Sequence, residues 1–246
     1  MRDKTMRITM QRLDSTPAMP HRKIRRKLLA LVLACTALTP LIAEKPVTIS
    51  EEIEWTWEVR PLHPDPKLPN VLLLGDSISR NYFPEVCKNL TGIANVYLMA
   101  SSTSVGDPRL EHQIKEFAET EKVRFSVVHF NNGMHGWAYT EDQYKAAFPA
   151  FLRTVQSLTE NDGVLIWAST TPVRQDATNG ATNSYVEERN RIALGFVQAV
   201  GIPLDDQFTL MQAHQDLYQD SIHFNSAGAT IQGDQATAMI RKALNQ

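Results

Sequence analysis

The stretch VLLLGDSISRNYF, residues 71–83, decides how this chain is expected to fold. Its four leading apolar residues, 71–74, are typical of a strand that is buried on both faces, because a half-exposed strand would alternate apolar with polar residues. Gly75, Asp76 and Ser77 then end the apolar run, and a segment with helical spacing follows. The stretch therefore predicts a strand, a tight turn and a helix, with a carboxylate and a hydroxyl at the turn.

The same alternation of strands and helices continues along the chain. After the first strand, further strands are predicted at 95–99, 125–130, 164–168 and 202–204, and helices at 78–90, 108–120, 141–158, 184–200 and 227–244. Doubly apolar strands separated by amphipathic helices indicate a mainly parallel sheet with helices on both faces. The predicted fold is a three-layer α/β/α sandwich that forms one domain from residue 70 to 246.

The amino-terminal residues 1–43 have the features of an export signal. They carry nine Lys/Arg against two Asp, and a basic run at 21–27 precedes an apolar run at 28–43. That run is shorter than the roughly 20 residues that a membrane-spanning helix needs. We therefore expect a periplasmic or extracellular protein, with Met19 as an alternative start. Cleavage near the end of the run and lipid attachment at Cys35, as in a lipoprotein, both remain open.

A proline-rich lead-in, residues 44–69, connects this segment to the predicted domain. Trp55 and Trp57 lie at strand-like spacing within it, and its five prolines are at positions 46, 61, 64, 66 and 69. Proline is disfavoured in central strands and helix interiors, so the composition predicts an extended segment that contains one short strand.

The composition excludes several classes of function. From residue 44 onward there are 16 Lys/Arg against 25 Asp/Glu, a net charge near −9 that would repel a phosphate backbone, so no nucleic-acid partner is expected. The sequence has no glycine-rich phosphate loop and no HxxxH or HExxH pair, so we expect neither a nucleotide cofactor nor a metal. With 43% hydrophobic residues, the chain can bury one substantial core.

Polar residues follow the predicted strands, at the edge where ligands bind in open parallel sheets. Ser77 follows the first strand, residues 131–135 (Asn-Asn-Gly-Met-His) follow the third, and Asp220 and His223 precede the last helix. A serine hydroxyl needs a base to become a nucleophile, and an imidazole needs a third group to fix its tautomer. Asp220 and His223, three residues apart on a turn, could supply both.

The two motifs resemble those of the SGNH or GDSL hydrolases. The matching residues are Gly75-Asp-Ser-Ile78 near the start of the domain and Asp220-Ser-Ile-His-Phe-Asn-Ser-Ala-Gly228 near its end, and the resemblance covers residues 70 to 244 in element order. It implies a flavodoxin-like sheet, with Ser77 as nucleophile, His223 as general base and then acid, and Asp220 as the orienting carboxylate. No cofactor is implied.

The chain departs from the family pattern at the expected oxyanion hole. The resemblance implies donors from the Ser77 N–H, from a backbone N–H after the second strand, and from an asparagine after the third. Here Ser101 and Ser102 stand where a glycine is usual, so either could supply the backbone donor. His135 stands where the asparagine is usual, and Asn132 in a shifted turn is the alternative.

Three further residues, Asp76, Asn131 and Trp137, are candidates for substrate binding. Asp76 is expected to hydrogen-bond the backbone within the site. Asn131 either contacts substrate or fixes its loop, and Trp137 either stacks on a sugar ring or packs under the loop.

These observations predict an exported serine esterase that removes O-acetyl or short acyl groups from extracellular carbohydrate. Three alternatives stay open: an O-acyltransferase that uses the same triad, a lipase or thioesterase, and a catalytically silent carbohydrate-binding protein.

Overall fold

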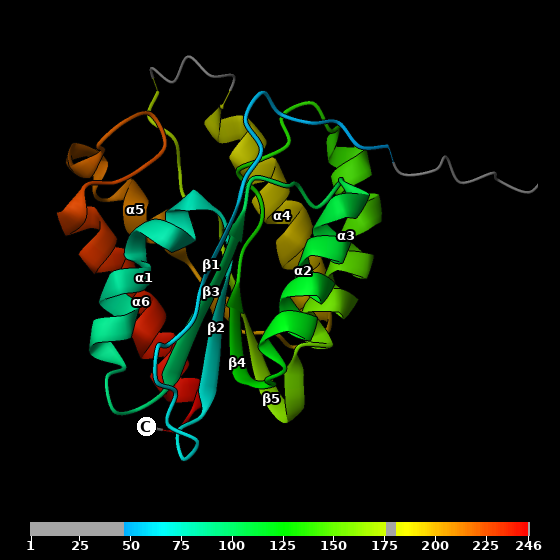
Figure 1. The fold of residues 1–246 in the computed structure, drawn as a ribbon. Helices are drawn as coiled ribbons and strands as arrows, with labels where there is room; N and C mark the ends of the chain where they lie inside the picture. The colour runs from blue at the N-terminus through cyan, green and yellow to red at the C-terminus, as the bar shows by residue number, and fades with distance from the viewer. Residues whose placement is uncertain (1–46, 176–180, 246) are drawn as a thin grey trace, which may run out of the picture. The chain divides into compact units, whose positions relative to one another are not determined.

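Six strands form one sheet in the computed structural model, which describes residues 47–175 and 181–245. β1 is antiparallel to β3, and all other neighbouring strands are parallel, so the predicted mainly parallel sheet is confirmed. Leaving out β1, the spatial order is that of a flavodoxin-like sheet. The strands, in spatial order (Figure 1), are β1 (Thr56–Val59), β3 (Asn95–Ser101), β2 (Asn70–Gly75), β4 (Phe125–Phe130), β5 (Thr159–Ala168) and β6 (Leu204–Asp205).

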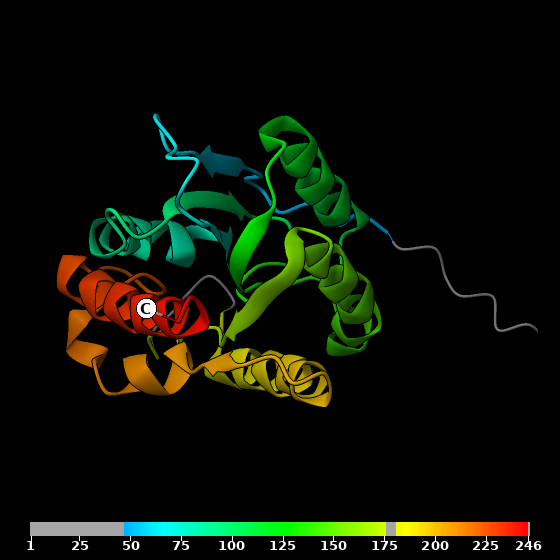
Figure 2. The same ribbon diagram turned by 90° about the horizontal axis from the view of Figure 1, so that it is seen from below.

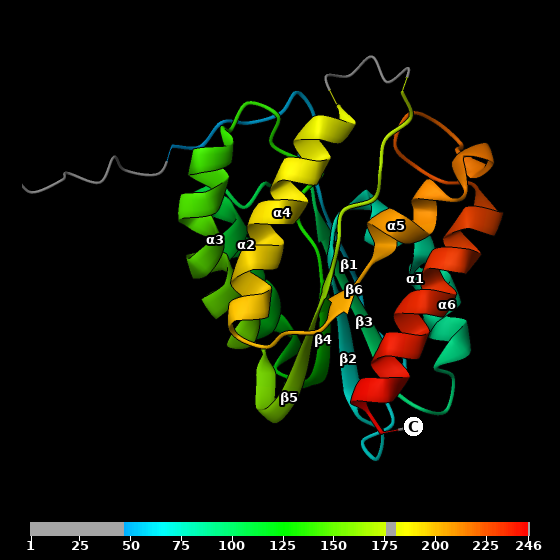
Figure 3. The ribbon, with the colours of Figure 1, turned by 180° about the vertical axis from the view of Figure 1, so that it is seen from behind.

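Two layers of helices cover the sheet, as the views in Figures 2 and 3 show. On one face lie α1 (Ser77–Asn89), α5 (Gln207–Gln212) and α6 (Ser226–Ala243). On the other lie α2 (Pro108–Glu121), α3 (Glu141–Gln156) and α4 (Asn183–Ala199). The predicted three-layer sandwich is therefore confirmed, while α5 and the 3₁₀ turn Gln215–Leu217 were not predicted.

The apolar run of strand β2 is uninterrupted because helices cover both faces of this strand. Leu72 and Leu74 pack into the core beneath α2, α3 and α4, whereas Val71 and Leu73 pack into the core beneath α1 and α6. All four side chains are at most 3% exposed. Successive side chains of a strand point to opposite faces, so a strand covered on both sides needs apolar residues at every position.

The lead-in is built onto the sheet. β1 pairs with β3 in antiparallel register from Thr56 to Val59, and the predicted short strand is therefore present. Just before it, the Trp55 carbonyl accepts a hydrogen bond from the Ser102 N–H over 3.1 Å. In Figure 1 the blue segment that precedes β1 crosses the end of the sheet at which β2 and β4 finish.

The sheet has its topological switch point between β2 and β4. The chain leaves β2 toward α1 on one face and leaves β4 toward α3 on the other, although the two strands are hydrogen-bonded neighbours. Connections that diverge in this way leave a crevice at the carboxyl ends of the strands. The structure thus places the turn at Ser77 and the loop at 131–140 on either side of one crevice.

The predicted export signal, the alternative start at Met19 and the candidate lipid site at Cys35 lie outside the described residues. Within residues 47–175 and 181–245, no helix has the length and apolar character needed to cross a membrane.

Candidate active site

Ser77 is the first residue of α1, immediately after β2. Asp76 caps this helix, because its Oδ1 accepts the Ile78 N–H over 2.9 Å. As a first-turn residue, Ser77 has a backbone N–H with no acceptor inside the helix. Gly75 permits the tight turn, since a Cβ at this position would lie 2.2 Å from the Ser79 hydroxyl. The turn therefore presents both the hydroxyl and the N–H of Ser77 at the sheet edge.

A hairpin-like loop before α6 brings His223 to Ser77. Tyr218 and Phe224 form an antiparallel bridge across the base of the loop, and the Gln219 N–H donates to the His223 carbonyl over 2.8 Å. From α1, the Asn81 side-chain amide donates to the Phe224 carbonyl over 2.8 Å. This bond fixes the loop one turn away from Ser77.

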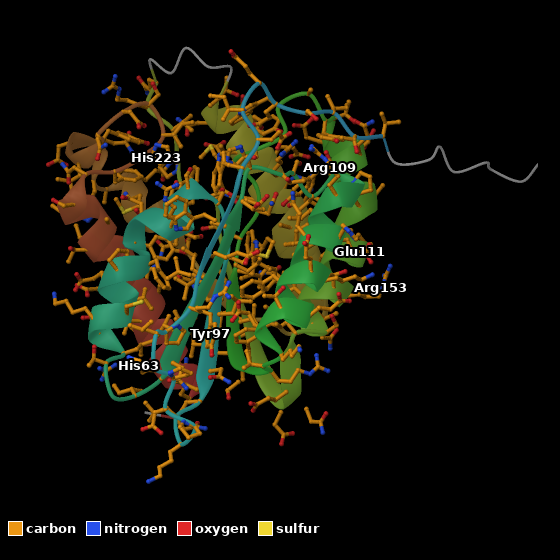
Figure 4. The ribbon with its side chains drawn as sticks, viewed as in Figure 1. His63, Tyr97, Arg109, Glu111, Arg153 and His223 are labelled. Atoms are coloured by element: carbon orange, nitrogen blue, oxygen red, sulfur yellow. The ribbon has the colours of Figure 1, made fainter. Side chains whose placement is uncertain are left out.

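The three residues of the predicted triad are in contact. His223 Nε2 lies 2.7 Å from Ser77 Oγ, and His223 Nδ1 lies 2.9 Å from Asp220 Oδ2. Figure 4 labels His223 at the end of the sheet at which β2 finishes. An imidazole between a hydroxyl and a carboxylate can accept the hydroxyl proton while the carboxylate stabilises the resulting positive charge.

Asp220 is held as an anion by local hydrogen bonds. Its Oδ1 accepts the backbone N–H groups of Ile222 over 2.8 Å and His223 over 2.7 Å. Partial burial would raise the pKa of Asp220, but these bonds and the neighbouring imidazole outweigh it and hold the pKa below its usual value. An ionised carboxylate only accepts hydrogen bonds, so Nδ1 of His223 is the protonated nitrogen that donates to it.

A second imidazole, that of His135, lies across the crevice with a carboxylate of its own. His135 Nδ1 is 2.9 Å from Glu51 Oε2, and the Gly136 N–H donates to Glu51 Oε1 over 2.7 Å. Gly136 has φ of +80°, and a Cβ there would lie 2.3 Å from the Ser104 Cβ, so only glycine fits this turn. Nε2 of His135 is buried and has no hydrogen-bond partner within the described part of the chain.

The charges around His135 favour its protonated form. Burial alone would lower the pKa of His135, but the hydrogen bond to Glu51 and the charges of Asp76, Glu51 and Glu54 raise it above its usual value. Burial would likewise raise the pKa of Glu51, yet the bonds from His135 and Gly136 lower it. Each shift favours a charged pair.

Arg189 of α4 holds the loop that carries His135. Its side chain is fully buried and donates to the carbonyl oxygens of His135, Gly136 and Tyr139 over 2.5, 2.8 and 3.2 Å. The guanidinium carbon also lies 4.0 Å from the ring centroid of Tyr185. Because no carboxylate is among these partners, the positive charge is stabilised by carbonyl dipoles and an aromatic face.

Two hollows meet at Ser77. One has a volume of about 550 Å³ and the other about 600 Å³, and both are lined by Trp55, Ser77, His135 and His223. The first has a largely apolar wall made of Ile49, Ile53, Trp55, Met134, Trp137 and Ile222. The second is more polar and adds Arg80, Asn81, Gln219 and Asp220. An ester seated at Ser77 would therefore have room on both sides of its carbonyl.

Comparisons with known proteins rest on structure alone, since no family model and no curated protein matches the sequence. Solved structures that match include a member of the lipolytic G-D-S-L family from Veillonella parvula, with a TM-score of 0.56, 17% identity, and coverage of 70% of this chain and 98% of that one. The C-terminal catalytic domain of peptidoglycan O-acetyltransferase A from Streptococcus pneumoniae matches with a TM-score of 0.51, 15% identity, and coverage of 72% and 96%. An acetylxylan esterase from Geobacillus stearothermophilus matches with a TM-score of 0.56, 13% identity, and coverage of 72% and 94%.

The chain has the fold of the GDSL hydrolases. The resemblance inferred from the two sequence motifs is thus confirmed at the level of the fold.

Within this GDSL fold, three of the predicted oxyanion residues are engaged elsewhere. The Ser102 N–H donates to the Trp55 carbonyl, so the expectation that it faces substrate is wrong. The Ser101 hydroxyl donates to Gln113 over 2.9 Å, and Ser101 is the last residue of β3. The Asn132 amide donates to the Thr103 carbonyl over 2.9 Å and accepts the Val105 N–H over 3.1 Å, which pins the neighbouring loop. Ser77 and His135 are the predicted donors that line the hollows.

The three candidate substrate-binding residues differ in their contacts and in whether they line a hollow. Asp76 is 1% exposed and caps α1, as expected. The Asn131 amide donates to the Ala168 carbonyl and the Thr170 hydroxyl, so it fixes its loop. Trp137 lines the first hollow and packs on Tyr185, with ring centroids 4.6 Å apart.

The sequence carries no local signal that marks Glu51, Trp55 or Arg189 as parts of the site. Glu51 and Trp55 belong to the lead-in, and the strand-like spacing of the two tryptophans indicated only a strand. Arg189 occupies a polar position in a helix, and no local signal marked it as buried. Within the described residues, no group of three His, Cys, Asp or Glu side chains could hold a metal ion.

Proposed function

We propose that the protein is a serine ester hydrolase with Ser77 as nucleophile. The observation that carries this proposal is the continuous contact from Ser77 Oγ through His223 to Asp220, at 2.7 and 2.9 Å. These distances are within the range that proton transfer requires. The Ser77 hydroxyl is also partly accessible and opens onto both hollows.

In this mechanism, Ser77 Oγ attacks the ester carbonyl carbon while its proton passes to His223 Nε2. The tetrahedral intermediate collapses as the C–O bond to the alcohol breaks, and His223 returns the proton to the departing alcohol oxygen. Water then attacks the acyl-enzyme with His223 again as base, which releases the acid and restores Ser77. Asp220 stays ionised throughout and stabilises the imidazolium.

The negative charge that develops on the carbonyl oxygen needs donors fixed in advance. We assign two: the backbone N–H of Ser77 and the Nε2–H of His135. The helix α1 also begins at Ser77, and the positive end of its dipole favours an anion there.

The finer proposal is that the substrate carries O-acetyl or short acyl groups on extracellular carbohydrate. The hollows on both sides of Ser77 suit a long alcohol part that runs across the site, and Trp55 and Trp137 offer aromatic surface for sugar rings. One protein of the same fold is an acetylxylan esterase, which supports this class of substrate. The basic and apolar amino-terminal segment supports export to the periplasm or beyond.

The decisive experiment compares wild type with Ser77→Ala on acetylated xylan, acetylated peptidoglycan and p-nitrophenyl esters from acetate to octanoate. We expect acetate release by wild type that is lost in the variant, together with fluorophosphonate labelling at Ser77. Equal release by both proteins would overturn the proposal. Higher rates on octanoate than on acetate would instead favour a lipase or thioesterase, and absence of labelling would favour a silent binding protein.

An O-acyltransferase is the second candidate, because the fold also matches the catalytic domain of a peptidoglycan O-acetyltransferase. It would use the same acyl-enzyme, with a sugar hydroxyl in place of water as the acceptor. Product analysis in the presence of competing oligosaccharide acceptors separates the two: acetylated oligosaccharide indicates transfer, and free acetate alone indicates hydrolysis.

A further inference from the structure

Glu51 determines which nitrogen of His135 carries a proton. Its carboxylate lies against His135 Nδ1 at 2.9 Å, and its other oxygen accepts the Gly136 N–H at 2.7 Å. An ionised carboxylate has no proton to donate, so His135 must be the donor in the first of these bonds. Nδ1 of His135 therefore carries a hydrogen.

This assignment restricts what Nε2 can do. A neutral imidazole has one N–H, and here it would be on Nδ1, which leaves a lone pair on Nε2. A lone pair directed at a developing oxyanion would repel it. Only the doubly protonated ring also has a hydrogen on Nε2, so His135 can serve as an oxyanion donor only as an imidazolium.

We infer that Glu51, a residue of the lead-in, is a positioning residue that holds His135 as an imidazolium and thereby turns its Nε2 into a charged donor for the oxyanion formed at Ser77. The inference rests on the serine hydrolase function proposed above. It assigns the segment before β1 a part in catalysis, in addition to its part in the wall of the first hollow.

The groups that surround the ring support this state. The acidic groups are Glu51 and Glu54 from the lead-in and Asp76 at the start of α1, and together their charges raise the pKa of His135 against the effect of burial. The Arg189 guanidinium donates to the loop carbonyl oxygens, and the imidazole of His223 lines the same two hollows. Arg109 pairs with Glu54 over 2.9 Å and offsets part of that charge, so Glu51 is the carboxylate that contacts the ring directly.

The burial of Nε2 is an independent observation. This atom is shielded from solvent and has no partner within the described residues. A buried N–H without an acceptor is destabilising, and a substrate oxygen that accepts it removes this cost at the moment when charge develops. An interaction formed mainly in the transition state lowers the barrier without tightening substrate binding.

The two carboxylate–imidazole pairs of the site then have opposite roles. In the Asp220–His223 pair, Nε2 contacts the Ser77 hydroxyl and must be unprotonated to act as a base. In the Glu51–His135 pair, Nε2 must be protonated to act as a donor. The rate should therefore fall as the pH rises through the pKa of His135, which lies above its usual value.

The test measures kcat and KM for p-nitrophenyl acetate across pH for wild type, Glu51→Gln and His135→Asn. Glu51→Gln keeps the size of the side chain and removes its charge. We expect kcat to fall roughly tenfold to a hundredfold, as is usual when a partner behind an active-site group is lost, with little change in KM. The alkaline limb of its profile should disappear, because the new amide keeps the Gly136 bond with its oxygen and donates from its NH₂ to Nδ1, which leaves a weaker, neutral Nε2–H donor at every pH. His135→Asn supplies an amide donor at every pH, so its alkaline limb should disappear.

Glu58→Gln is the matched control, because Glu58 is an exposed residue of β1 that pairs with Arg60 over 3.4 Å and lies outside both hollows. It removes the same charge seven residues along the segment and should match wild type. A Glu51→Gln profile that superimposes on that of wild type would overturn the inference, as would an alkaline limb that persists in His135→Asn.

Failure of the inference and failure of the proposed function give different results. If wild type neither hydrolyses ester nor reacts at Ser77 with a fluorophosphonate, the proposed function is wrong, and the inference falls with it. If wild type does both and Glu51→Gln is unchanged, only the inference is wrong. Nitrogen-15 NMR of the histidine rings reads the protonation of His135 directly, even where a variant folds poorly: two protonated nitrogens at neutral pH support the inference, and one contradicts it.

Discussion

The guanidinium of Arg189 donates from Nη1 to the backbone carbonyl of His135 over 2.5 Å, so a side chain of α4 sets the position of an imidazole that lies 54 residues earlier in the chain. Two more loop carbonyls, those of Gly136 and Tyr139, accept from the same side chain. A planar fork of donors can satisfy several carbonyl groups at once, which an ammonium group cannot do in the same geometry.

Arg189→Met should destabilise the protein and also lower its activity. The change leaves three carbonyl groups without their donor, and a loss of about 3–5 kcal/mol in the free energy of unfolding is expected. Arg189→Lys keeps the charge without the fork and should give an intermediate loss. Urea unfolding followed by circular dichroism measures both.

Arg191→Met is the control for Arg189, because Arg191 lies on the same helix with its side chain 70% exposed and bonds only Glu188 among the described residues. Its unfolding midpoint should equal that of wild type. A midpoint for Arg189→Met that also equals wild type would show that the loop does not depend on this side chain.

Asp220→Asn should abolish most catalysis while leaving binding intact. An amide can offer its NH₂ group to His223 Nδ1, which places the ring proton on Nε2 and removes the base from Ser77. In a well-studied serine protease, the equivalent change lowers kcat about 10⁴-fold, and a loss of roughly 10³- to 10⁴-fold is expected here. Steady-state kinetics on p-nitrophenyl acetate should show this fall in kcat with a nearly constant KM.

Asp216→Asn provides the comparison for Asp220, since Asp216 is an exposed residue of the same loop region, in the 3₁₀ turn. It should retain wild-type kinetics. Retention of more than a tenth of kcat by Asp220→Asn would mean that His223 is oriented by other groups.

The elements that the sequence predicted well are those whose signal is local. A run such as residues 71–74 must be apolar throughout because both faces of β2 are covered. Such an uninterrupted apolar run can be recognised from the sequence alone. The contact between Ser77 and His223 was also predictable, since both follow from motifs at fixed positions in the element order. Short elements such as α5, with six residues, leave too few positions for a periodic pattern.

The features of the candidate site that the sequence did not predict depend on packing between segments that are distant along the chain. Glu51 lies in a proline-rich stretch without periodicity, and its role arises only when that stretch crosses the loop at His135. Ser102 was a reasonable candidate donor until β1 paired with β3 and engaged its N–H. A short lead-in strand can pair with either edge of a sheet, and the sequence contains no signal for that choice.

A buried pair of His129 and Asp205 should make stability depend on acid pH. His129 Nε2 lies 2.7 Å from Asp205 Oδ2, and Gln235 Nε2 donates to Asp205 Oδ1 over 2.6 Å. Burial would raise the pKa of Asp205, but these bonds lower it. A lowered pKa adds stability that is complete above the unfolded-state value of about 3.9 and is lost as the pH falls through the folded-state value.

Asp205→Asn should therefore lower the free energy of unfolding by about 2–4 kcal/mol at neutral pH and flatten its dependence on pH below about 4. Urea titrations at a series of pH values measure both effects. Asp162→Asn, at an exposed position of β5, removes the same charge and should leave the curve of wild type unchanged. Parallel pH curves for Asp205→Asn and wild type would contradict the assignment.

Tyr139→Phe should release the lead-in from the active site. The Tyr139 hydroxyl accepts the Ile49 N–H over 2.7 Å and donates to the Val47 carbonyl over 3.0 Å, so a buried residue of the His135 loop holds the segment that carries Glu51. Loss of two hydrogen bonds should cost about 1–2 kcal/mol of local stability and raise amide exchange of residues 47–54 about tenfold. KM should rise because Ile49 and Ile53 form the wall of the first hollow, and kcat should fall because Glu51 loses its position.

Tyr97→Phe is the control, since Tyr97 is a buried tyrosine of β3 that Figure 4 shows far from His223. Hydrogen–deuterium exchange read by mass spectrometry should find the lead-in peptide protected in this variant and exposed in Tyr139→Phe. If exchange of the lead-in rises in Tyr139→Phe while kcat and KM stay at wild-type values, the segment does not contribute to the site. In that case the contacts of Arg189 and Tyr185 from α4 with the loop carbonyls are enough to position His135.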